Sequence, residues 1–99
     1  MTAHWTLTTT TARRVDTMIG SAQDHVVAVT AVLAATLDAI DDARTVETSD
    51  LPRYELRASG ELVALIQTGT DNAGRPDHAD TAELIQRIEA SRTFGVSPY

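Results

Sequence analysis

Apolar residues recur every three or four positions from residue 15 to residue 40. This is the spacing of one face of an α-helix. The stripe consists of Val15, Met18, Ala22, Val26, Val29, Leu33, Leu37 and Ile40. A threonine at position 10 or 11 can cap the helix, and the stripe keeps its phase across Gly20, although an internal glycine costs about 1 kcal/mol relative to alanine. We expect one long helix here, with two helices broken at Gly20 as the alternative, and a loop over residues 43–48.

A second stripe of the same rhythm predicts a second helix from Ser49 or Asp50 to about residues 70–73. Pro52 is tolerated in a first helical turn, and Gly74 and Pro76 are stop signals beyond the end. The apolar positions of this stripe are Leu51, Tyr54, Leu56, Ala58, Leu62, Val63, Leu65, Ile66 and Gly69. A third, shorter helix is expected from Asp77 or Asp80 to Ser91, on the stripe of Ala82, Ile85 and Ile88.

The two ends of the chain lack a helical rhythm. Trp5 and Leu7 alternate with threonines, which is typical of a short edge strand or of a loosely held arm. We favour an arm whose tryptophan docks on the helices, because a large aromatic side chain is seldom left free. The expected organisation is an arm or edge strand over 1–11, a single helical domain over 12–92 and a C-terminal tail over 93–99.

These elements predict an all-α fold, with a long helical hairpin and a shorter third helix. Short loops make sequential helices antiparallel neighbours, and two striped helices make half of a four-helix bundle. A homodimer would complete the bundle, with Leu33 and Leu62 facing each other or the partner. The predicted interface and core residues are Val26, Val29, Leu33, Leu37, Ile40, Leu62, Leu65 and Ile66.

Composition narrows the possible partners and compartments. The formal net charge is −6, and all eight basic residues are arginines. Nucleic acid is therefore not an expected partner, because phosphates require a basic face. No membrane contact is expected, because the most apolar run, 26–37, is far shorter than the roughly 20 residues of a membrane span. The chain has no cysteine and shows no signal-peptide pattern, so we expect a cytoplasmic protein.

One cluster of charged residues is a candidate ligand site. On the predicted second helix, Arg53, Arg57 and Glu61 share a face, and Arg57 can pair with Glu61 at a spacing of four. At a bundle interface, two arginines could form a pocket for an anion. We take these three residues as the candidate ligand-binding set.

No metal, cofactor or catalytic residue is expected. His25 stands at the edge of the first stripe, and the acidic residues near His78 fit the start of a helix, where the helix dipole favours negative charge. The trio Asp38, Asp41 and Asp42 lacks the further oxygen ligands that a calcium site requires, and is interpreted as a solvated face. No combination of nucleophile, base and orienting group can be drawn.

The sequence therefore favours a small non-enzymatic interaction or adaptor module that binds itself, with another protein as a second candidate partner. One alternative is a small dimeric regulator of transcription or signalling, which would use Arg13, Arg14 and the threonine-rich arm. The other is a helical-bundle enzyme or a carrier of anionic ligands that would use Arg53, Arg57 and Glu61.

Overall fold

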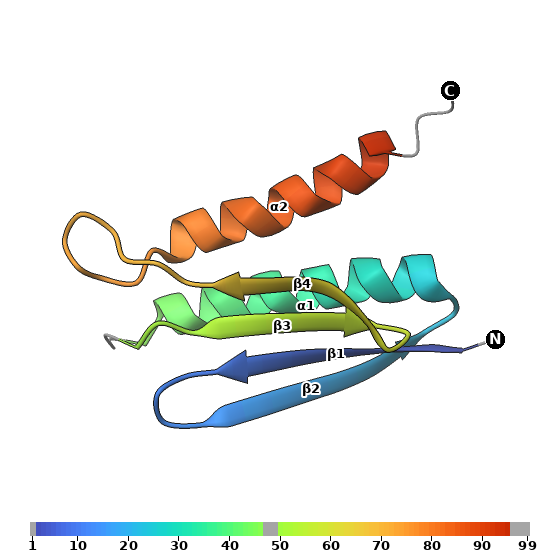
Figure 1. The fold of residues 1–99 in the computed structure, drawn as a ribbon, viewed down its shortest axis with the longest axis horizontal. Helices are drawn as coiled ribbons and strands as arrows, with labels where there is room; N and C mark the ends of the chain where they lie inside the picture. Colours follow the sequence, from blue (N-terminus) through green and yellow to red (C-terminus); the bar gives the residue numbers. More distant parts are fainter. Residues whose placement is uncertain (1, 47–49, 96–99) are drawn as a thin grey trace.

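The computed structural model describes residues 2–46 and 50–95 and has an α+β fold (Figure 1). Its elements in chain order are β1 (Ala3–Thr10), β2 (Val15–Ala22), α1 (His25–Arg44), β3 (Arg53–Ala58), β4 (Glu61–Gln67) and α2 (His78–Gly95). The predicted all-α fold is therefore wrong, and the helical bundle built on it is not present. The strands form one antiparallel sheet in the order β2-β1-β3-β4.

Two tight hairpins build this sheet. At the β1–β2 turn, the Thr11 backbone N–H donates to the Arg14 carbonyl oxygen at 2.9 Å. At the β3–β4 turn, Ser59 and Gly60 both have positive φ, of 54° and 79°. That is the backbone of a two-residue type I′ turn, which suits the twist of paired strands. The register places Leu7 of β1 opposite both Met18 of β2 and Leu56 of β3.

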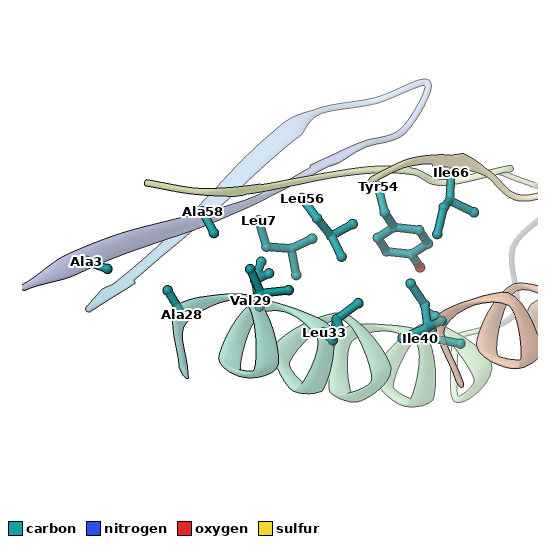
Figure 2. Close-up of a cluster of buried hydrophobic side chains, with 12 residues drawn as sticks. Ala3, Leu7, Ala28, Val29, Leu33, Ile40, Tyr54, Leu56, Ala58 and Ile66 are labelled. Atoms are coloured by element: carbon teal, nitrogen blue, oxygen red, sulfur yellow. The ribbon is translucent and has the colours of Figure 1, made fainter. Parts of the chain in front are cut away.

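The two faces of the sheet have different environments. The inner face, which carries Leu7, Tyr54 and Leu56, packs on α1, as Figure 2 shows. α2 packs beside α1 on the β4 side of the molecule (Figure 1). The opposite, outer face of the sheet is not covered by any described element. The buried core comprises Ala3, Leu7, Ala28, Val29, Val32, Leu33, Ile40, Tyr54, Leu56, Ala58, Ile66 and Ile85.

The long first helix of the sequence analysis is wrong in its first half. Residues 3–10 form β1, a central strand and not an arm, and residues 15–22 form β2. Gly20 is not a helix break but the partner of Trp5 across the two strands, where a Cβ atom would overlap Cε2 and Cζ2 of the indole ring. The helix begins only at His25, where the Asp24 carboxylate accepts the Val27 backbone N–H at 2.9 Å.

The second predicted helix is wrong throughout, because residues 53–67 form the β3–β4 hairpin. Its buried residues Tyr54, Leu56 and Ala58 alternate, as in a strand with one face covered. The third predicted helix is present as α2, and Asp77 caps it by accepting the Asp80 backbone N–H at 3.0 Å. The predicted tail begins inside α2, which continues to Gly95, and residues 96–99 lie outside the described residues.

Candidate functional site

A groove opens on the inner face of the sheet, between the β1–β2 hairpin and the C-terminal half of α1. It encloses about 880 Å³. It exists because α1 does not cover the first half of β2. Met18 and Leu7 are opposite each other on the same face, yet Met18 is 51% exposed and Leu7 only 2%. The apolar part of the lining consists of Met18, Ala39, Ala43, Val46 and Pro52.

Two polar side chains, that of the buried Tyr54 on β3 and that of the partly buried His78 at the start of α2, also line the groove. Among the described residues, neither Tyr54 Oη nor His78 Nδ1 has a hydrogen-bond partner, although both atoms are shielded from solvent. Burial raises the pKa of Tyr54. Burial also lowers the pKa of His78, and Arg44 lowers it further, against the opposing effect of Asp77. Both side chains are therefore neutral near pH 7.

Charged side chains surround the mouth of the groove. Arg14 Nε lies 2.8 Å from Asp16 Oδ2, and Arg13 Nε lies 3.9 Å from Asp50 Oδ2. With Asp42, the lining therefore holds three carboxylates and two guanidinium groups, which leaves one formal negative charge. The mouth does not have the excess of positive charge that would attract an anion.

A second candidate feature is the outer edge of β2, which we call the open edge (Val15–Ala22). Among the described residues, β1 is the only strand that pairs with β2, and no residue of β2 is buried. Val15 and Ile19 are exposed on the outer face, Ile19 at 72%, and Met18 is half exposed on the inner face. An edge strand with apolar side chains on both faces and free backbone N–H and C=O groups is a template for another strand.

The centre of the outer face is polar and needs no cover. Thr6 and Thr8 of β1 lie beside Glu55 and Arg57 of β3. An antiparallel sheet with one such polar face is stable in water. The apolar exposure of the outer face is confined to its two margins, Val15 and Ile19 on β2 and Leu62 and Leu65 on β4.

The structure does not bring together the predicted ligand-binding set. Arg53 and Arg57 lie on β3 and Glu61 begins β4, so the helical face assigned to them is absent. Arg57 Nε instead donates to Glu55 Oε2 at 2.9 Å, within the same strand. None of the three lines the groove.

The predicted interface and core residues are divided between buried and exposed positions. Val29, Leu33, Ile40 and Ile66 are buried, and Leu37 packs partly buried against them. The exposed members of the set are Val26, Leu62 and Leu65. Leu33 lies in the core and Leu62 on the outer face, so the two do not pack against each other within this chain.

His25, a further candidate from the sequence, has a local partner. His25 Nδ1 lies 3.0 Å from Ser59 Oγ, which ties the start of α1 to the β3–β4 turn. No group of three potential metal ligands occurs within residues 2–46 and 50–95. Sequence reasoning missed Tyr54 and His78 as site residues, because only the tertiary fold places them in one cavity. The alternation of Tyr54, Leu56 and Ala58 was the available signal that Tyr54 stands on a strand.

Comparison with known proteins adds no relative. No protein-family model matches the chain, and no curated protein and no solved structure is significantly similar to it. In the part of the chain that the structure describes, neither helix has the length and apolar character needed to cross a membrane.

Proposed function

We propose that this protein is a non-enzymatic interaction module that pairs the open edge of β2 with the same edge of a second copy. The observation that carries the proposal is the exposure of apolar side chains on both faces of β2, above all Ile19 at 72%. Burying an exposed side chain of this size contributes roughly 1.5–3 kcal/mol. Such a homodimer would join two four-stranded sheets into one.

The strand lacks most of the usual protections against pairing. Its eight register pairs with β1 run without a bulge, and it contains neither proline nor lysine. Natural edge strands are commonly protected by such residues or by irregularity. The one charged residue, Asp16, stands near the start of the strand.

Antiparallel pairing of two identical strands also suits this sequence. A two-fold axis through Ile19 would place Ile19 opposite its own copy and Thr17 opposite Ser21. Asp16 would then face Ala22 of the other copy, so no like charges would meet. Cross-strand apolar pairs contribute roughly 0.2–1 kcal/mol each, in addition to the hydrogen bonds of the ladder. We place this proposed function in the cytoplasm, with which the cysteine-free composition is compatible.

Because the natural chain has no cysteine, a single engineered thiol can test the pairing. Ile19→Cys should be converted rapidly to a covalent dimer by a short bifunctional thiol reagent at low micromolar protein concentration. Leu65→Cys is the matched control, since Leu65 is 53% exposed on the outer face of β4. Cross-linking of Leu65→Cys should be much slower, because it requires random encounters between molecules that are not paired through β4.

A second variant separates pairing from chance reactivity. Ile19→Lys places a charge on the open edge without touching the core, and it should abolish association while the circular dichroism spectrum stays unchanged. Equal cross-linking rates for the two cysteine variants, or association that survives Ile19→Lys, would overturn the proposal.

A further inference from the structure

Tyr54 Oη and His78 Nδ1 are hydrogen-bonding atoms that the described protein groups leave unused. Native proteins pair the great majority of buried polar atoms, and each exception calls for an explanation. Tyr54 is 0% exposed, and its ring extends from β3 towards α1, with the hydroxyl at the α1 end (Figure 2). His78 approaches from α2, and both residues belong to the lining of the same groove.

The chemistry of these two atoms defines what they can bind. A phenol hydroxyl both donates and accepts, and a neutral imidazole Nδ1 does one or the other, according to its tautomer. Both groups are held neutral, since burial raises the pKa of Tyr54 and lowers that of His78. A complementary group is therefore itself uncharged and offers both a donor and an acceptor, as a carboxamide or a hydroxyl does.

The remaining lining residues of the groove determine the size and polarity of the rest of the ligand. Met18, Ala43 and Val46 provide apolar contact, and the volume of about 880 Å³ lies in the range of small-molecule sites. The arginines at the mouth are already near carboxylates, and the lining carries one net negative charge. An anionic ligand would meet that charge without a free cation to offset it.

We propose that this groove binds an uncharged small organic molecule with a compact apolar body and one carboxamide or hydroxyl group. The polar group hydrogen-bonds to Tyr54 Oη and His78 Nδ1, and the apolar body lies against Met18, Ala43 and Val46. The site is contained in one chain, so this inference does not rest on the pairing of β2.

Benzamide is a suitable probe, because it combines a flat ring with a neutral carboxamide. Titrated into the protein, it should shift the NMR methyl signals of Met18 and Val46 in a saturable way. Tyr54→Phe should weaken its binding about tenfold, the effect of losing one hydrogen bond of ordinary strength. Ile19→Lys should bind benzamide as the natural protein does. Benzoate, of the same shape but anionic, should bind more weakly than benzamide.

The stability of Tyr54→Phe without ligand provides an independent readout. If the hydroxyl has no partner in the free protein, its removal should leave the denaturant midpoint unchanged or slightly higher. A lower midpoint would show that the hydroxyl already has a partner, and would overturn the proposal. The absence of saturable shifts with benzamide, benzamide binding unaffected by Tyr54→Phe, or equal affinity for benzoate would overturn it as well.

Discussion

The two outermost strands of the sheet, β2 and β4, occupy equivalent places in the strand order but have different surroundings. β4 is interrupted by a register shift opposite Leu56 and Arg57, and its Ile66 is buried in the core. The segment after β4 is tied to α2, where Thr81 Oγ1 donates to Thr68 Oγ1 at 3.5 Å. β2 runs straight, buries no residue and lies away from the C-terminal half of α1.

This difference indicates where binding can occur on the molecule. On the β4 side, the register shift makes the edge strand irregular, and the segment that follows β4 is tied to α2. On the β2 side, two binding features lie next to each other. β2 has an open edge because, among the described residues, only β1 pairs with it, and a groove lies beneath its inner face because α1 does not cover the first half of the strand.

The largest expected effect compares two paired residues on the inner face. Leu7→Ala should lower the free energy of unfolding by about 2–5 kcal/mol, because Leu7 is buried between the sheet and α1. Met18→Ala, directly opposite on β2, should cost about 1 kcal/mol or less, because half of its side chain is already exposed. Urea unfolding measures the two changes in the free energy of unfolding. Both substitutions are made in the Ile19→Lys variant, so that association does not contribute. Similar costs would mean that α1 covers β2 as fully as β1.

Gly20→Ala should cause the next largest loss of stability. The added Cβ would overlap the indole ring of Trp5, which has to move for the methyl group to fit. Overpacking of this kind typically costs about 1–3 kcal/mol. Thermal unfolding of Gly20→Ala, of Trp5→Leu and of the double variant forms a cycle. The double variant should be more stable than the sum of the two single effects predicts, and strict additivity would contradict the Trp5–Gly20 contact.

A smaller effect should appear on the α2 side as the pH falls. Because burial and Arg44 lower the pKa of His78 in the folded protein below its ordinary value near 6.5, the unfolded chain binds a proton more readily. The contribution of His78 to stability is therefore complete above about pH 6.5 and declines as the pH falls towards the folded pKa. Urea unfolding between pH 7.5 and pH 5.5 should show this loss, and His78→Gln should reduce it. An identical pH dependence in the two proteins would contradict the lowered pKa of His78 in the folded protein.

Much of the α1 core could be predicted from the sequence, because the helical stripe is real there. Val29, Leu33 and Ile40 are buried, at the spacing that the sequence analysis used. The stripe was extended too far towards the N-terminus, since Val15 and Met18 fit the three–four rhythm by coincidence. A strand that is exposed on both faces has no alternation to reveal it, and β2 is such a strand.

The β3–β4 hairpin was predictable in part. Tyr54, Leu56 and Ala58 alternate, and Ser59-Gly60 is a turn signal between two strands. The exposed Leu62 and Leu65 made the hairpin resemble a helix in the sequence. They continue the three–four spacing of apolar residues, because the register shift breaks the alternation expected of a strand. The groove was not predictable, since it depends on how far α1 reaches beneath β2. That distance is set by tertiary packing and not by any local pattern.

The most direct test of the open edge is the absolute mass of the protein in solution, measured by light scattering on a sizing column at two concentrations tenfold apart. The natural protein should have twice the chain mass of 10.6 kDa at the higher concentration, and Ile19→Lys should have the single-chain mass at both. Leu65→Lys should behave as the natural protein does. A natural protein that stays a monomer at both concentrations, or a dimer that Leu65→Lys disrupts and Ile19→Lys does not, would contradict pairing through the open edge.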